Sequence, residues 1–338
     1  MKDSTNITEA REFEKATLQI AGSTSYQQKV WVLMAAIASF KLVIAFVLDL
    51  GNDEAYYWLY SQDMKWNYFD HPPMVAVWAR LSTLNLWLQE YPGFIRLGSI
   101  ASNAVATWVL YKTVTTLHSQ KAGWLAACLY NASFYAGITA GLFIMPDAPQ
   151  MVFWTLSLWM LARITKDASS WTNWILFAIA AGLCMMSKVH GVFIYFGLAL
   201  FIIIRRWQWL KLPQLYVATA ISLLIVSPIL IWNIQNNFAS YRFHSARVKV
   251  DETVETFPFI REILQQFLYN NPFNVVLMLI AIVAGLQLGY KKLPALSLYN
   301  CIALPLAGAL LFVSLFRDAT LPHWSGPAYV TLVPAAAM

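Results

Sequence analysis

Residues able to do chemistry are concentrated between Gly51 and Pro73, in the segment GNDEAYYWLYSQDMKWNYFDHPP. Its first acidic pair, Asp53 and Glu54, follows directly on an apolar run. A carboxylate at such a boundary is partly desolvated, which raises its pKa toward that of a general base able to take a proton from a hydroxyl group. The same pair also fits a plain helix start, because acidic residues are favoured in a first turn. The spacing alone leaves both interpretations open.

The second polar group in this segment is the tetrapeptide DHPP. Pro72 excludes His71 from the α region, and two successive prolines stiffen the backbone, so Asp70 and His71 are expected on a rigid, extended strut. Pro73 can then open the next helix. A rigid Asp-His pair suits the binding of a phosphate or the orientation of a hydroxyl group. A helix start with a polar turn is the simpler alternative.

Later segments add more acids, imidazoles and amines at the ends of apolar runs. MPDAP places Asp147 between prolines, where a tight turn is an equally good explanation. SKVHG holds Lys188 and His190, and an amine that snorkels to the membrane surface would have the same position. A basic cluster after residue 233 suits a phosphodiester or anionic lipid headgroups. This cluster and the segment FRDATLPHW contain Arg242, His244, Arg247, Lys249, Arg317, Asp318 and His323.

The elements that must position these groups are membrane helices. The chain has 338 residues, 59% of them hydrophobic and 12% charged, which is typical of a multi-pass membrane protein. The apolar runs predict an all-α, polytopic transmembrane helix bundle of about nine to ten spans, since about 20 apolar residues cross a bilayer. The expected spans are 30–50, 97–117, 122–142, 149–164, 171–188, 192–204, 215–232, 272–290 and 294–316.

Residues outside the spans indicate how the chain is organised. Segment 74–91 has apolar residues at helical spacing, so amphipathic juxtamembrane helices are expected in the first extracytoplasmic loop. Residues 1–29 are expected to form a cytoplasmic N-terminal segment and residues 30–338 one membrane domain, apparently truncated because PAYVTLVPAAAM is too short to cross. Lysine and arginine are in modest excess on the N-terminal side, while the acids gather on the other face. Lys41, inside the first span, is expected to snorkel or to face a neighbouring helix.

Several classes of protein fit poorly. The net charge of +6 comes from scattered basic residues without a basic stripe, which argues against a nucleic-acid partner. Cys128, Cys184 and Cys301 fall in separate expected spans without a CxxC pair, which argues against a disulfide scaffold or a zinc knuckle. A divalent metal could be ligated by Asp53, Asp147 and the outer histidines, although no ligand spacing requires one.

Five motifs, DEAYY, YFDHPP, MPDAP, SKVHG and PHWSGPAY, together resemble the pattern of bacterial GT-C glycosyltransferases. The nearest groups are the protein O-mannosyltransferases and the transferases that add aminoarabinose or uronic acid to lipid A, and the likeness covers nearly all of residues 30–335 in order. It implies a multi-pass protein of the bacterial inner membrane. The donor would be a polyprenyl phosphate carrying one sugar, transferred on the periplasmic face to a hydroxyl of lipid A core, another glycan or a protein.

The resemblance also implies roles for particular residues. Asp53, with Glu54 beside it, would be the catalytic base, and the anomeric configuration would invert. Lys188 and one of Arg242 or Arg247 would hold the donor phosphate, with His71 in support. Some relatives have glutamate and lysine at the positions of Asp70 and His71, so this phosphate contact is expected to be weaker or pH dependent. The donor and substrate contacts expected are Asp70, His71, Asp147, Lys188, His190, Arg242, His244, Arg247 and His323.

Two alternatives come from other classes of protein. A lipid or sugar transporter, or a flippase without transferase activity, predicts charged residues near mid-membrane and two related halves with broken helices. Here only Lys41 lies deep, and no related halves are visible. A noncatalytic membrane scaffold leaves the gathering of acids, imidazoles and amines on one face unexplained.

Overall fold

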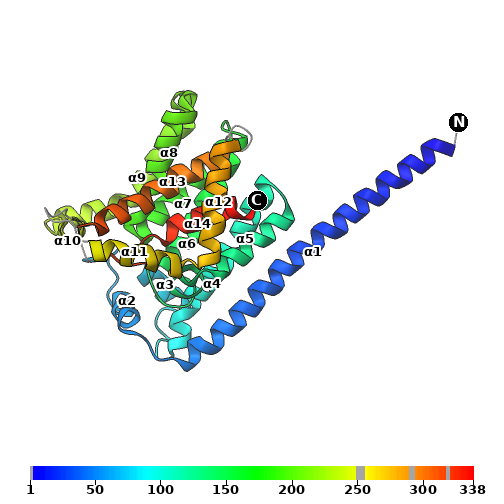
Figure 1. The fold of residues 1–338 in the computed structure, drawn as a ribbon. Helices are drawn as coiled ribbons and strands as arrows, with labels where there is room; N and C mark the ends of the chain where they lie inside the picture. Colours follow the sequence, from blue (N-terminus) through cyan, green and yellow to red (C-terminus); the bar gives the residue numbers. More distant parts are fainter. Residues whose placement is uncertain (1–2, 249–255, 289–293, 317–319) are drawn as a thin grey trace.

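The computed structural model describes residues 3–248, 256–288, 294–316 and 320–338, and within these ranges all regular structure is helical (Figure 1). The expected all-α fold is confirmed. The helices are α1 (Asp3–Val47), α2 (Asn52–Gln62), α3 (Met74–Ser82), α4 (Pro92–Leu117), α5 (Gln120–Ala132), α6 (Asp147–Lys166), α7 (Trp171–Ser187), α8 (Val192–Arg205), α9 (Pro213–Gln235), α10 (Ala239–Arg247), α11 (Thr256–Tyr269), α12 (Pro272–Leu288), α13 (Pro294–Ser314) and α14 (Gly326–Ala337).

Local sequence explains where several helices begin. Pro92 and Pro213 stand in the first turns of α4 and α9, where a residue without an N–H costs nothing. Ser119 caps α5 by accepting a hydrogen bond from the backbone N–H of Ala122 at 3.2 Å, and Ser170 caps α7 in the same way. These caps begin α5 and α7 directly after short connections, residues 118–119 and 167–170.

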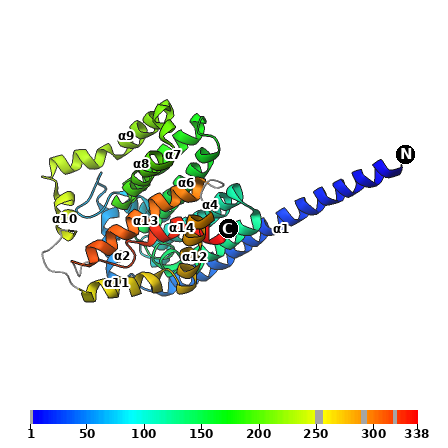
Figure 2. The same cartoon turned by 45° about the horizontal axis from the view of Figure 1, so that its top comes forward.

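The core of the bundle surrounds α6, which packs against α4 and α7, while α7 packs against α9 and α13 packs against both α8 and α14. Trp154 on α6 is fully buried and donates its indole N–H to the Thr331 hydroxyl of α14 at 2.8 Å. In both views α1 lies against α4 and α5 with its C-terminal half, and its N-terminal half projects away from the bundle (Figures 1 and 2).

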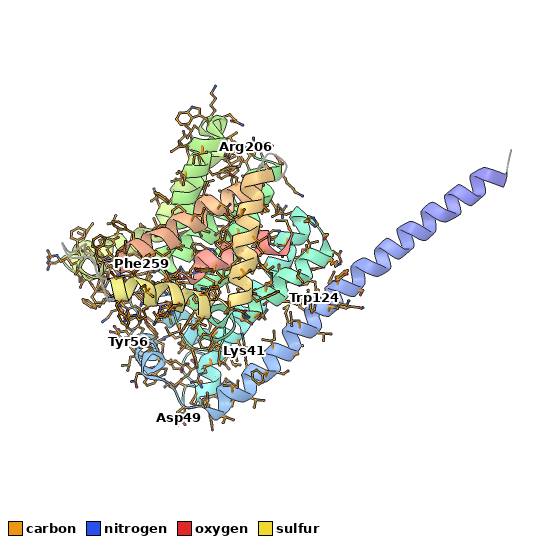
Figure 3. All side chains as sticks on the ribbon, viewed as in Figure 1. Lys41, Asp49, Tyr56, Trp124, Arg206 and Phe259 are labelled. Atoms are coloured by element: carbon orange, nitrogen blue, oxygen red, sulfur yellow. The ribbon has the colours of Figure 1, made fainter. Side chains whose placement is uncertain are left out.

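Three described helices are long and apolar enough to cross a membrane by length and composition: Ser25–Val47 of α1, α9 and α13. A fourth span results if α11 and α12, which meet at a bend of 99°, are counted together. The expected nine to ten spans are not reached by this criterion. One reason is length, since α5, α7 and α8 have 13, 17 and 14 residues. Asp49 and Arg206 lie at opposite ends of the molecule, which fits a bundle with two distinct faces (Figure 3).

Three boundary predictions were wrong. The helix expected over 74–91 ends at Ser82, because Leu84, Asn85 and Leu86 all have positive φ and the Leu86 N–H bonds the Thr83 hydroxyl instead. The span expected over 122–142 ends at Ala132 and is followed by a π-helical turn, Tyr135–Thr139. The span expected over 215–232 continues to Gln235 in α9, and the described residues between it and the span expected over 272–290 include α10 and α11.

Lys41 faces the interior of the bundle and is 3% exposed. Its ammonium group and the amide nitrogen of Asn103 on α4 both border Gly141, where an added Cβ would lie 2.7 and 2.9 Å from them. Lys41 was expected either to snorkel to the membrane surface or to face a neighbouring helix. In the structure it faces a neighbouring helix.

Candidate active site

A buried ion pair fixes the connection between α1 and α2. Arg96, near the start of α4, meets the Glu54 carboxylate in a bidentate pair, with Nε 2.8 Å from Oε1 and Nη2 2.6 Å from Oε2. Both side chains are at most 5% exposed. The guanidinium also donates to the carbonyl oxygens of Ala45, Leu48 and Asp49. Its N–H groups therefore bond to residues at the end of α1 and the start of α2.

Glu54 accepts two further hydrogen bonds, from the backbone N–H of Gly51 at 3.0 Å and from that of Ile144 at 3.2 Å. Its carboxylate is thus enclosed by protein donors and is not open to a substrate. The neighbouring Asp53 is exposed, in the first turn of α2. The two acids of the DE pair therefore differ in their surroundings: one is a buried structural anion, and the other faces outward.

Asp70, in the DHPP segment, is held by two tyrosines of α2. The hydroxyls of Tyr56 and Tyr60 both donate to its Oδ1 atom, and they lie 2.8 Å from each other. Figure 3 shows Tyr56 on α2. The Asp70 backbone oxygen contacts Nε2 of His244 on α10 at 2.7 Å. The DHPP segment is therefore held between α2 and α10, and its backbone bends at Asp70 and His71 where an extended strut was predicted.

Tyr57 connects the exposed Asp53 with the interior of the site. It lies one helical turn after Asp53, and its ring centroid is 5.5 Å from that of His71. Burial raises the pKa of Tyr57, and the nearby carboxylates of Asp70, Asp147 and Asp53 raise it further. Tyr57 therefore stays protonated and places a neutral hydroxyl among three anionic groups.

Lys188 and Asp147 form a second buried ion pair. The Lys188 ammonium lies 2.9 and 2.8 Å from the two carboxylate oxygens of Asp147, and both side chains are at most 3% exposed. The Tyr135 hydroxyl donates to Asp147 Oδ1 at 2.8 Å. This pair joins the start of α6 to the end of α7, and it leaves Lys188 as a cation whose charge is largely balanced by protein.

Two cavities open on this region. The larger, of about 500 Å³, lies between α8 and α13 and is called here the α8–α13 cavity. Its polar end is formed by His71, Lys188, His190, His244 and Arg247, and its walls include Phe193, Leu306, Leu310, Phe312 and Val313. The Arg247 guanidinium stacks on the ring of Trp324 at 4.6 Å, which holds it at the cavity wall. The cavity therefore combines a basic end with a long apolar wall.

The smaller cavity, of about 330 Å³, lies between α8 and α9 and is called the α8–α9 cavity. Asn67, Asp70, Ser240 and Tyr241 form its polar end, and Met185, Val226 and Ile229 form its apolar wall. The two cavities share four residues, which are His71, Val189, Val192 and His244.

The histidines around the larger cavity are neutral at pH 7. Burial, followed by the nearby Lys188 ammonium, lowers the pKa of His190 to about 3 and that of His323 to about 4. Burial and Lys188 hold the pKa of His71 well below its usual range, and burial lowers that of His244. The imidazoles thus add hydrogen-bonding atoms but no charge, and an arriving anion would raise their pKa values by favouring the protonated form.

The candidate residues from the sequence are brought together only in part. His71, Lys188, His190, His244 and Arg247 line the α8–α13 cavity, and Asp70, His71 and His244 line the α8–α9 cavity. The remaining candidates line neither cavity; these are Asp53, Glu54, Asp147, Arg242 and His323. Lys249, Arg317 and Asp318 lie outside the described residues. In the described part of the chain, no group of three or more His, Cys, Asp or Glu side chains could hold a metal ion.

Sequence reasoning missed Arg96, Tyr56, Tyr60 and Trp324. Arg96 had an available signal, because an arginine beside an apolar span is expected to have a buried acidic partner or to mark a functional site. The two tyrosines lie four residues apart on α2, the spacing that puts two side chains on one helix face. Nothing in the sequence indicates that this face meets Asp70.

The family described as dolichyl-phosphate-mannose-protein mannosyltransferase matches residues 70–232. The matched region begins at Asp70 and includes both Asp147 and Lys188, the partners of the second buried pair. Asp53 and Glu54 precede it, and the basic residues of α10 follow it.

A curated relative is the lipid A galacturonosyltransferase RgtD of Rhizobium johnstonii, which is 24% identical over 195 residues. This match covers 57% of the present chain and 40% of the relative. Among solved structures, ArnT from Cupriavidus metallidurans in the apo state superposes with a TM-score of 0.67 at 15% identity, over 92% of this chain and 59% of that one. The oligosaccharyltransferase AglB from Archaeoglobus fulgidus, in complex with an inhibitory peptide and a dolichol-phosphate, gives a TM-score of 0.53 at 13% identity, over 92% and 50%. The chain therefore spans about two fifths to three fifths of the length of these proteins.

Proposed function

We propose that this chain is a GT-C glycosyltransferase, which its matched family and its fold support, and that it transfers one sugar from a polyprenyl phosphate to a hydroxyl group of an acceptor. The observation that carries the proposal is the α8–α13 cavity. Its basic end, with Lys188 and Arg247, suits a phosphate, and its apolar wall along α13 suits a prenyl chain. The lipid would thus lie beside a helix that is itself long and apolar enough to cross the membrane.

Asp53 is the proposed general base. It would take the proton of the acceptor hydroxyl while the acceptor oxygen forms a bond to the anomeric carbon. The bond between that carbon and the phosphate oxygen breaks, and its electron pair leaves with the polyprenyl phosphate. Attack opposite the leaving group inverts the anomeric configuration. Glu54 is then a positioning residue, because its bond network with Arg96 fixes the first turn of α2 that carries Asp53.

Stabilisation of the leaving phosphate falls to the basic end of the cavity. Lys188 and Arg247 supply positive charge, and the neutral imidazoles of His71 and His190 can donate hydrogen bonds or accept a proton as negative charge develops. Asp147 reduces the net charge of the Lys188 site but keeps its ammonium group in one place. The site would then be poised for a phosphate that gains charge during the reaction rather than for one that binds strongly beforehand.

The setting proposed for this reaction is the bacterial inner membrane, with the site on the periplasmic face. Asp49 and Arg206 at opposite ends of the bundle support two distinct faces (Figure 3). The acceptor would be a glycan, a lipid such as lipid A, or a protein, as the names of the matched family and relative suggest.

Sugar transfer by the purified chain in vesicles tests the proposal. The donors are polyprenyl phosphates carrying radiolabelled mannose or galacturonic acid, and transfer to a membrane extract is measured for wild type and Asp53→Asn. Loss of a general base lowers the rate by about 10²–10⁴-fold. Asp63→Asn is the matched control, because Asp63 is an exposed acid at the other end of α2, and it should keep full activity.

Equal rates for wild type and Asp53→Asn, at equal thermal midpoints, would rule out Asp53 as the base. Movement of labelled lipid across the vesicle membrane without sugar transfer from any donor would instead favour the transporter alternative.

A further inference from the structure

The two cavities are neighbours and share part of their lining at the start of α8. Val192, the first residue of α8, and Val189, in the turn before it, line both cavities, and His71 and His244 line both at the polar end. Beyond these shared residues the walls diverge, toward α13 on one side and toward α7 and α9 on the other. Two apolar chains could therefore lie on either side of α8 with their head groups meeting at the two histidines.

The polar ends of the two cavities differ in charge. The α8–α13 cavity is lined by Lys188 and Arg247, whereas the charged residue that lines the α8–α9 cavity within the described chain is Asp70. The shared histidines do not change this contrast, because burial lowers the pKa values of both His71 and His244 and keeps them neutral. A phosphate is favoured in the first cavity and repelled from the second.

Asp70 is arranged to accept a hydrogen bond inside the smaller cavity. Tyr56 and Tyr60 both donate to Oδ1, so within the described residues Oδ2 accepts no hydrogen bond. Next to it, Asn67 donates to the Ser240 hydroxyl at 2.8 Å, which in turn donates to the Tyr68 carbonyl. This linked set uses the Ser240 hydroxyl within the protein and leaves the Asp70 carboxylate as a charged acceptor that an incoming hydroxyl group can reach.

We infer that the α8–α9 cavity binds the acceptor, and that the acceptor is a lipid with an apolar tail and an uncharged, hydroxyl-bearing head. The tail lies along Met185, Val226 and Ile229, and a head-group hydroxyl donates to Asp70. The inference rests on the proposed function, which assigns the other cavity to the donor. Entry is from the membrane, because the apolar wall belongs partly to α9, a helix long and apolar enough to cross it.

Photocrosslinking of the full chain in lipid nanodiscs tests the inference. Tyr241→p-benzoylphenylalanine places the photoreactive group in the α8–α9 cavity, and Phe312→p-benzoylphenylalanine places it in the α8–α13 cavity. Both residues are exposed aromatics, so each replacement is conservative and the two are matched. The probes are dodecyl maltoside, with a neutral polyhydroxyl head, and dodecyl phosphate. The yield of each adduct is measured by intact-protein mass spectrometry.

The expected result is a preference of roughly tenfold for dodecyl maltoside at position 241 and the reverse preference at position 312. Asp70→Asn should remove most of the discrimination at position 241 and leave that at position 312 unchanged. Equal or greater labelling by dodecyl phosphate at position 241 would overturn the inference, since it would indicate that one donor chain occupies both cavities. If the position 241 variant does not fold, Val226→p-benzoylphenylalanine probes the same cavity.

The crosslinking experiment measures binding selectivity without any sugar transfer. It can therefore contradict the acceptor site without contradicting the proposed sugar transfer, and the reverse. The expected selectivity in a chain that transfers no sugar would contradict the proposed function and leave a neutral-lipid site in place. Sugar transfer without selectivity at position 241 would retain the proposed function and remove the acceptor assignment.

Discussion

Replacement of Arg96 by leucine should be among the most damaging single changes in this chain. The variant leaves the Glu54 carboxylate buried, with only the backbone N–H groups of Gly51 and Ile144 as donors. It also removes the donor for three carbonyl oxygens at the end of α1. Breaking one partner of a buried ion pair costs about 3–5 kcal/mol, because an uncompensated charge remains. We expect a loss of this size in the free energy of unfolding.

The measurement is urea unfolding in dodecyl maltoside micelles, followed by circular dichroism. Lys65→Leu is the control, since its ion pair with Asp63 is exposed and should leave the transition unchanged. Glu54→Leu should cost about as much as Arg96→Leu, and the double variant should cost less than the sum by about 0.5–3 kcal/mol. A loss below about 1 kcal/mol for Arg96→Leu would refute the reasoning, because it would place the pair among the ordinary surface ion pairs.

Two further predictions concern the same face of the molecule. His323 is neutral in the folded chain, so between about pH 6.5 and pH 4 only the unfolded chain binds the proton, and stability should fall as pH drops through this range. His323→Gln should reduce this fall by up to about 1.4 kcal/mol per pH unit, as measured by thermal unfolding at a series of pH values. An unchanged slope would contradict the assignment. Gly326→Ala would put a Cβ 2.3 Å from the Tyr135 ring, so it should displace the hydroxyl from Asp147 and cost about 1–3 kcal/mol. Gly308→Ala, with open space around the Cβ position, should be neutral or stabilising, and equal midpoints for the two variants would disprove the steric argument.

Much of the scaffold follows from the sequence. Apolar runs and helix caps locate most helices, whereas the extended strut predicted from the prolines of DHPP has bends at Asp70 and His71. The end of α3 could not be predicted, because the segment up to Glu90 keeps an amphipathic pattern while its backbone turns at Leu84. Periodicity reports which side chains share a face, but not whether the chain continues as a helix against its tertiary neighbours.

The pairing of charges within the site was the harder part. Asp147 and Lys188 were both candidates for substrate contact, yet they bind each other across 41 positions of the sequence. Likewise, Glu54 was expected beside Asp53 as a second catalytic acid and instead meets Arg96, 42 positions later. Packing between segments far apart in the sequence decides which helix faces meet. This packing cannot be read from a single sequence. The structure places part of the candidate residues around two cavities, and their roles stay predictions.

The pair between Glu54 and Arg96 also bears on how the chain is made. The two residues are 42 positions apart, so at about 5–20 residues per second the ribosome adds Arg96 about 2–8 s after Glu54. During this interval the carbonyl oxygens at the end of α1 and the Glu54 carboxylate have no guanidinium to bind. The first span can therefore enter the bilayer early, but its C-terminal end reaches its final geometry only once α4 has followed. The DE segment would thus remain accessible to water, insertion factors or proteases for the first seconds of its life.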